Sequence, residues 1–110
     1  MEVIPERGDS WWVSLAPALG SEIRKTRPCV VISVKVLNER RRTVIVVPLS
    51  SSPKASPPIL IPITCDGHPA VAVSDQIRAV AKERLRSRLG VVTTDEMAAL
   101  EDGIRQIMQL

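Results

Sequence analysis

The sequence predicts a mainly β protein: a small, strongly curved sheet closed by a C-terminal helix. Short runs rich in valine and isoleucine alternate with loops rich in proline, glycine and serine, a pattern typical of strands and turns. After Thr93 the apolar period changes from that of a strand to that of a helix. At 110 residues the chain forms one domain, residues 1–110. An SH3-like barrel is the natural architecture for so few short strands before one helix.

Five short strands are expected before the helix, and a sixth segment continues the sheet. The continuous β-branched run from Cys29 to Val34 predicts a strand buried on both faces. Asn38 to Arg42 is interpreted as a polar hairpin connection, and two long loops, 16–27 and 50–58, carry prolines. The expected strands cover residues 11–15, 29–34, 43–49, 59–64 and 70–74, with 77–81 as the continuation.

The C-terminal segment carries the signals of an amphipathic helix. Thr93, followed three residues later by Glu96, forms a capping box that starts the helix. Gly103 weakens the helix slightly. Apolar residues then recur at helical spacing over about four turns: Met97, Leu100, Ile104, Ile107 and Met108.

Composition indicates an ordinary soluble protein, with 45% apolar and 25% charged residues. No apolar run approaches the roughly 20 residues that cross a bilayer, and no signal-peptide pattern opens the chain. A cytoplasmic location without membrane contact is therefore expected. With only two cysteines, Cys29 and Cys65, and no metal-ligand spacing, we expect two free thiols.

Charge is distributed unevenly along the chain. Residues 22–88 hold 13 basic and five acidic residues, whereas the two ends together hold two basic and seven acidic residues. A basic middle suggests an anionic partner such as RNA or an acidic protein segment. A solvated surface is the equally simple alternative.

The most informative segment is Gly20-Ser-Glu-Ile-Arg-Lys-Thr-Arg-Pro28, which leads directly into an apolar strand. Pro28 fixes its own φ and biases Arg27 towards extended geometry. Arg27 therefore stands where a basic loop ends and a rigid strand begins. A guanidinium whose backbone is held in this way can point in one direction towards a phosphate group, as a phosphate-binding site requires.

Several stretches in register resemble the MazF/PemK/Kid family of type II toxin–antitoxin endoribonucleases, over roughly residues 6 to 109. They are Arg7-Gly8-Asp9 before Trp-Trp-Val, then Gly20 to Val31, Val46-Val-Pro-Leu-Ser-Ser51, Asp75-Gln-Ile-Arg78 and Lys82-x-Arg84-Leu85 before Leu89-Gly90. The resemblance implies the CcdB/MazF-type toxin fold and a homodimer. It also implies cleavage of single-stranded RNA at short sequences, without a metal or other cofactor.

In this family the 2′-hydroxyl of the RNA attacks the adjacent phosphate, leaving a 2′,3′-cyclic phosphate and a 5′-hydroxyl. DNA lacks that nucleophile and should not be cut. Cutting mRNA inhibits translation and growth. The resemblance also implies a cognate antitoxin protein, whose disordered segment blocks the RNA groove.

Three residues are expected to be catalytic. Arg27 aligns with the family's catalytic arginine and suits the phosphorane, although it could instead form a structural ion pair. Ser50 stands where the family usually has threonine, keeping the hydroxyl but losing the methyl group. Glu22 is the candidate general base; alternatively it pairs with a neighbouring cation on the surface.

The expected RNA-binding residues are Arg24, Lys25, Ser51, Asp75, Gln76 and Arg78. Asp75 could accept a hydrogen bond from a base edge, orient Arg27 or titrate in the site, or it could simply cap a strand. His68 is the only histidine, which excludes a two-histidine mechanism. Beside Gly67 and Pro69, it is interpreted as a turn residue.

Two alternative functions stay open. A homologue that binds antitoxin but has lost catalysis is suggested by Ser50 and by Val73, where some relatives carry an arginine. A gyrase-binding toxin resembling CcdB shares the fold. Such toxins end in a tryptophan-bearing segment, and this chain ends Gln106-Ile-Met-Gln-Leu110. That difference favours the nuclease.

Overall fold

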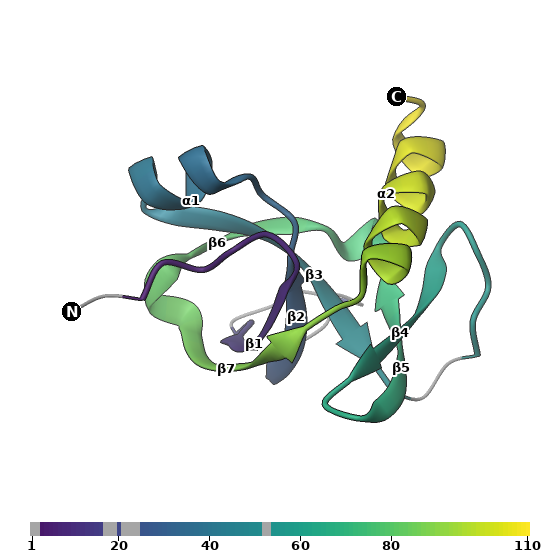
Figure 1. Ribbon diagram of the computed structural model, residues 1–110, viewed down its shortest axis with the longest axis horizontal. Coiled ribbons are helices and arrows are strands. Elements are labelled where there is room, and N and C mark those ends of the chain that lie inside the picture. The colour runs from purple at the N-terminus through teal and green to yellow at the C-terminus, as the bar shows by residue number, and fades with distance from the viewer. Residues whose placement is uncertain (1–2, 17–19, 21–24, 52–53) are drawn as a thin grey trace.

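The protein folds as one strongly curled sheet with a C-terminal helix at its end (Figure 1). The computed structural model describes residues 3–16, 20, 25–51 and 54–110. Within this part of the chain, seven strands are paired in the order β4-β5-β3-β2-β1-β7, and β6 pairs with β3. The strands are β1 (Asp9–Ser14), β2 (Thr26–Val31), β3 (Thr43–Ser50), β4 (Leu60–Cys65), β5 (His68–Val73), β6 (Arg78–Ala81) and β7 (Leu85–Val91).

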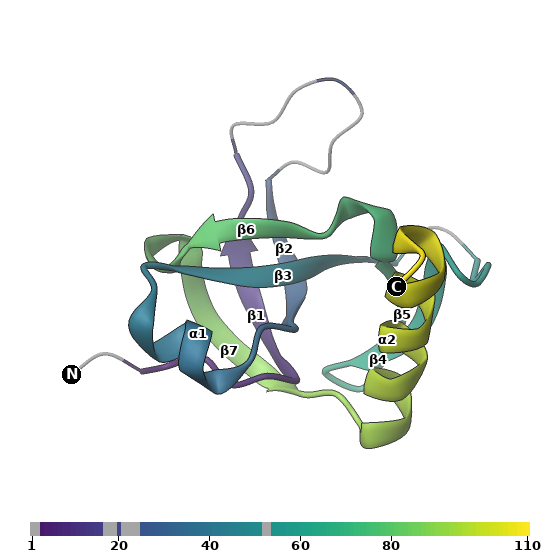
Figure 2. The same ribbon diagram turned by 90° about the horizontal axis from the view of Figure 1, so that it is seen from above.

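The long strand β3 organises the sheet. One of its edges pairs with β2, from Cys29 opposite Pro48 to Val31 opposite Val46. Its other edge pairs with β6 along its first half and with β5 at its end. Figure 2 shows β6 running beside β3. The chain between β5 and β6 leaves the sheet for one turn, the 3₁₀ helix η1 (Ser74–Gln76). A second such turn, η2 (Lys82–Arg84), joins β6 to β7.

The C-terminal helix is confirmed as α2 (Thr94–Met108). Its capping box is complete: Thr93 Oγ1 accepts from Glu96 N, and the Glu96 carboxylate accepts from Thr93 N. The same carboxylate accepts from Thr64 N at 2.6 Å, so the start of α2 is tied to β4. The helix packs against β4 and η1 (Figure 1).

The interpretation of Asn38 to Arg42 as a hairpin connection is wrong. A short helix, α1 (Lys35–Arg40), lies there, at the end of the molecule away from α2 (Figure 2). Asn38 is completely buried, and its amide nitrogen donates to the main-chain oxygens of Pro5 and Ser33, each at 3.0 Å. Because Asn38 finds these partners inside the fold, a residue that reads as a turn former anchors a helix instead.

Strand β7 was not expected from the sequence. It pairs with β1 in an antiparallel ladder interrupted by two register shifts. Its side chains are mostly exposed, including Arg86 and Arg88, so it lacks the apolar alternation that marks a half-buried strand. Backbone pairing with β1 places β7 in the sheet, although its side-chain pattern does not predict a strand.

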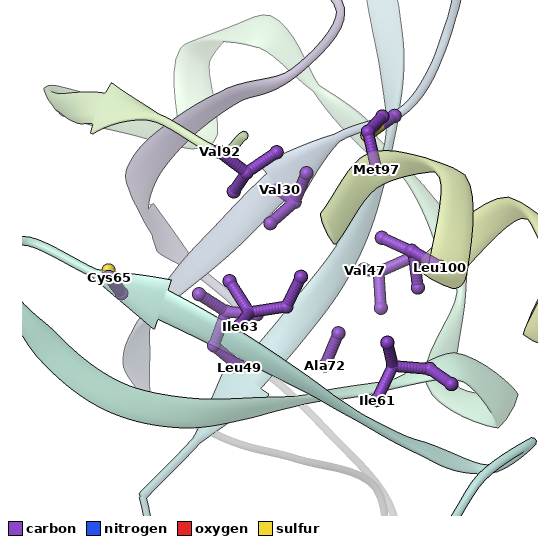
Figure 3. Packing of buried hydrophobic residues seen from close by; sticks show 10 residues of the cluster. All are labelled: Val30, Val47, Leu49, Ile61, Ile63, Cys65, Ala72, Val92, Met97 and Leu100. Carbon is purple, nitrogen blue, oxygen red and sulfur yellow. The ribbon is translucent and has the colours of Figure 1, made fainter. Parts of the chain in front are cut away.

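Two apolar clusters lie on the two faces of the central strands, which confirms that the expected strand is buried on both faces over residues 29–31. The strand was expected to continue to Val34, but β2 ends at Val31. Cys29 and Val31 belong to the cluster inside the curl of the sheet with Trp11 and Val13. Val30 belongs to the cluster under α2, which Figure 3 shows between α2, β4 and the central strands. Cys65 lies at the end of this second cluster away from Leu100 (Figure 3).

Among the described residues, no helix is long and apolar enough to cross a membrane.

Candidate functional site

A cavity of about 530 Å³ opens beside the second cluster, where the ends of several strands meet. Its size falls in the range of natural small-ligand pockets. The strands β1, β2, β3 and β7 and the β4–β5 hairpin all contribute to its wall. The lining residues are Trp12, Lys25, Thr26, Arg27, Pro28, Leu49, Ser50, Ser51, Cys65, Asp66, His68, Pro69, Ala70 and Leu89.

The cations of this cavity come from the start of β2. Arg27 is exposed, and its backbone lies opposite Val13 of β1, which is fully buried. Lys25 adopts a left-handed backbone with φ of 68°, and its main-chain oxygen accepts from Leu15 N at 2.9 Å. Two cations therefore line the cavity, which makes the site suited to an anionic ligand.

The hydroxyl groups come from the end of β3. Ser50 is half-buried and lies opposite Val71 of β5. Ser51, the next residue, is exposed. Because β2 and β5 flank β3 on its two edges, these serines lie between the cationic strand and the β4–β5 hairpin. Hydroxyls in this position can donate hydrogen bonds to an anion held by Arg27.

The β4–β5 hairpin carries a site residue that sequence reasoning missed. Asp66 and Gly67 both have positive φ, 50° and 78°, as a tight two-residue hairpin requires. The turn pairs Cys65 directly with His68, which is the first residue of β5 rather than part of the turn. His68 lines the cavity. The sequence signal for this position is the Asp-Gly pair before His68. An Asp-Gly pair predicts a two-residue hairpin turn, which places the following residue at the start of the next strand.

Both cysteine thiols are free, as expected, and both are buried. Burial raises the pKa of Cys29 to about 12, partly offset by the charge of Arg78. Burial also raises the pKa of Cys65, and the neighbouring Asp66 carboxylate raises it further. Both thiols therefore stay protonated at neutral pH, and the cavity's Cys65 contributes packing rather than a nucleophile.

Comparison with known proteins identifies the family. The model of the PemK-like, MazF-like toxins of type II toxin–antitoxin systems matches residues 6–108. The chain belongs to the MazF/PemK toxin family. It is 34% identical to Endoribonuclease MazF9 of Mycobacterium tuberculosis, over 94% of this chain and 96% of that protein. It is 27% identical to the Endoribonuclease toxin MazF of Escherichia coli K12, over 96% of this chain and 95% of that protein.

Solved structures confirm the MazF-type fold. The structure of MazF from Deinococcus radiodurans superposes with a TM-score of 0.89, covering 99% of this chain and all of that one at 21% identity. A mycobacterial endoribonuclease in complex with its cognate antitoxin superposes with a TM-score of 0.80 at 20% identity, covering 96% of each chain. The expectation of a MazF/PemK-type curled sheet with a C-terminal helix is thereby confirmed.

The cavity of this MazF-family chain brings together four of the expected site residues: Arg27, Ser50, Lys25 and Ser51. Three others are not among its lining residues. Asp75 and Gln76 are on η1, which packs against α2, and Arg78 is on β6 opposite Val46 of β3. Their roles stay predictions, as does that of every site residue named from the sequence. Glu22 and Arg24 lie outside the described residues.

Trp11 and Trp12 occupy opposite faces of β1, as their alternation predicts. Trp11 is buried, and its indole nitrogen donates to the Asp9 carboxylate at 3.2 Å. Trp12 is 37% exposed and lines the cavity. It lies opposite Pro28 of β2, next to Arg27. An exposed indole beside a cation can stack on a nucleobase whose phosphate the cation binds.

Proposed function

We propose that this protein is the endoribonuclease toxin of a type II toxin–antitoxin system. It cleaves single-stranded RNA at short sequences without a metal, acts as one domain in a homodimer, and inhibits translation and growth. The family membership supports the toxin, and the names of its curated relatives support the endoribonuclease. The observation that carries the mechanism is a single cavity lined by Arg27, Lys25 and the serine hydroxyls of β3.

Arg27 stabilises the phosphorane in this proposal. Attack of the 2′-hydroxyl on phosphorus adds negative charge to the nonbridging oxygens, and a guanidinium can donate two parallel hydrogen bonds to them. Its exposed position at the cavity, together with a backbone held in the β1–β2 ladder, suits this role.

Ser50 and Ser51 complete the anion site. Each offers one hydroxyl donor, and both line the same cavity as Arg27. Serine lacks the methyl group that restricts χ1 in threonine, so the Ser50 hydroxyl samples more rotamers. We expect Ser50 to support cleavage with a modest loss relative to threonine. Glu22 retains its proposed role as general base on sequence grounds.

The cognate antitoxin is proposed to cover this cavity. One structural neighbour is described as an endoribonuclease in complex with its cognate antitoxin, and its chain superposes on almost all of this one. Two cations at an open cavity would attract an acidic, disordered segment as they attract RNA. Antitoxin binding would then exclude the substrate directly.

The proposal is tested by incubating the purified protein with a long single-stranded RNA and with DNA of the same sequence, in EDTA. Primer extension then maps any cuts. Discrete RNA cuts at a repeated short motif, with intact DNA, are expected. Intact RNA from a folded protein that still binds its antitoxin would instead identify a homologue without catalysis.

A further inference from the structure

Arg84 connects two segments of the chain that lie 70 residues apart. Its Nη1 atom donates hydrogen bonds to the main-chain oxygens of Ser14, at 3.2 Å, and of Ala16. The side chain is half-buried. A hydrogen bond from a charged donor is stronger than one between neutral groups, so this contact is suited to holding backbone in place. The proposed function gives no role to Arg84.

These hydrogen bonds continue the sheet where β7 stops pairing with β1. The β1–β7 ladder ends at Val13, which lies opposite Leu85, the first residue of β7. The chain before Leu85 forms the turn η2, so β7 offers no further main-chain partners to β1. The Arg84 side chain supplies donors to the residues that follow Val13 instead.

The opposite edge of this segment pairs with the chain at the start of β2. Leu15 N donates to the main-chain oxygen of Lys25 at 2.9 Å. Successive residues of an extended chain turn their main-chain groups to opposite edges. Leu15 therefore bonds to the β2 side, and the residues on either side of it bond to Arg84. The end of β1 is thus held between Arg84 and the strand that carries Arg27.

We propose that Arg84 is a positioning residue of the nuclease site, an inference that rests on the proposed function. Lys25 and Arg27 line the cavity, whereas Arg84 is not among its lining residues. Arg84 therefore acts through the end of β1, which fixes the backbone that carries both cations. Donors stabilise a phosphorane most when they are held in place before the reaction begins.

The effect should appear in the cleavage step rather than in RNA binding. A displacement of about 1 Å near the reacting atoms can lower a rate on the order of 100-fold. The attraction between cations and the RNA backbone acts over about 10 Å and is much less sensitive to such a shift. Loss of Arg84 should therefore slow the bound RNA's cleavage and leave its affinity nearly unchanged.

The test compares wild type with Arg84→Met, which keeps an unbranched apolar stem but removes the donors. On an RNA that contains the mapped cleavage motif, its single-turnover rate should fall by about 10-fold to 100-fold. Its affinity for the same RNA with a 2′-deoxy nucleotide at the cut site should stay within about threefold. Arg84→Lys, which keeps a cationic donor, should recover part of the rate.

Two comparisons separate positioning from a general loss of structure or charge. Arg86→Met removes the same side chain from an exposed position in β7 and should cleave at the wild-type rate. Because Arg84 acts by holding Arg27, Arg84→Met should cost less than about threefold in a chain that already carries Arg27→Ala. If Arg84→Met does not fold, Arg84→Lys replaces it, and its smaller loss should also vanish beside Arg27→Ala.

Amide hydrogen exchange tests the contact independently of cleavage. The Leu15 amide, which bonds to Lys25, should exchange about 10-fold faster or more in the Arg84 variant than in wild type. The amide of Ile32 donates to Ile45 just beyond the other end of β2, and its exchange should not change.

Four results would each overturn the assignment. They are a rate of Arg84→Met within about threefold of wild type, an equal loss in Arg86→Met, an undiminished loss beside Arg27→Ala, and unchanged exchange at Leu15. A wild-type protein that cuts no RNA would contradict the proposed function itself. Faster exchange at Leu15 would still show in that case that Arg84 holds the end of β1.

Discussion

At the scale of single residues, the cavity depends on side chains whose backbones are fixed by pairing. Arg27 lies on β2 and Ser50 on β3, and because these two strands are neighbours, both residues line the same cavity. Asp9, by contrast, is a charged residue that is buried and has a structural role. It is 3% exposed, accepts hydrogen bonds from Glu6 N and Trp11 Nε1, and forms an ion pair with Arg88. The Arg-Gly-Asp sequence is therefore a turn that enters β1, with Asp9 buried as a structural acceptor.

Replacing Arg27 tests the role of the guanidinium. Arg27→Ala should lower the single-turnover cleavage rate by about 100-fold or more, because one charged donor to the phosphorane is lost. Arg27→Lys should recover only part of that loss, since lysine keeps the charge but not the two-donor geometry. The thermal midpoint should not change, because the side chain is exposed.

Arg41→Ala is the matched control. It removes the same charge from an exposed position at the end of α1, outside the cavity. Its cleavage rate should equal that of wild type. Equal losses in Arg27→Ala and Arg41→Ala would show that the total positive charge matters and not the aimed side chain.

At the scale of elements, the sequence predicts well wherever side-chain burial follows a simple period. The bounds of α2, its capping box and the doubly buried β2 follow from that pattern. The helix α1 and the strand β7 do not follow from it, because a buried asparagine anchors α1 and the side chains of β7 show no apolar alternation. The cavity residue His68 was missed for a related reason: only the hairpin register shows that it leaves the turn.

Gly103 has a packing role that its effect on helix propensity does not suggest. A Cβ atom at this position would lie 2.8 Å from the main-chain oxygen of Pro58 and 3.0 Å from Ile61 Cδ1. Gly103→Ala should therefore lower the free energy of unfolding by about 1–2 kcal/mol, because overpacking outweighs the gain in helix propensity. Urea denaturation measures this change.

The control for this variant is Ala99→Gly, at an exposed position of the same helix. It should cost roughly the 1 kcal/mol expected from propensity alone. If Gly103→Ala raised stability by a similar amount, the close approach of α2 to the turn at Pro58 would be refuted.

The carboxylate of Glu96 makes stability depend on pH. Burial raises the pKa of Glu96, but hydrogen bonds from Thr93 and Thr64 outweigh this effect, so the pKa lies below the ordinary glutamate value of 4.5. A lowered pKa means that the stabilisation is present above the pKa of the unfolded chain and is lost as pH falls through that of the folded chain.

Stability should therefore fall with acid below about pH 4.5, and Glu96→Gln should show a smaller fall. Denaturation at a series of pH values measures both. Asp95→Asn, which removes an exposed carboxylate from the same helix turn, should keep the wild-type slope. Parallel curves for wild type and Glu96→Gln would rule out this role for the carboxylate.

At the scale of the whole molecule, one curled sheet separates two apolar clusters, and the candidate site opens where the cluster under α2 ends. Local patterns predicted the strands around this opening except β7, and the family resemblance predicted Arg27 and Ser50. They did not predict that Asp75 and Arg78 would be absent from the cavity lining. The 3₁₀ turn η1 separates β5 from β6 along the same edge of β3, and the alternation of apolar residues in the sequence does not predict this turn.

The central claim is that this cavity cuts RNA through the RNA's own 2′-hydroxyl. The most direct measurement analyses the products of one RNA oligonucleotide containing the mapped motif, cut in EDTA. A second oligonucleotide carries a single 2′-deoxy nucleotide at the cut site. We predict a 2′,3′-cyclic phosphate and a 5′-hydroxyl from the first and no cleavage of the second. Cleavage of the 2′-deoxy oligonucleotide, or a 5′-phosphate product, would contradict the account.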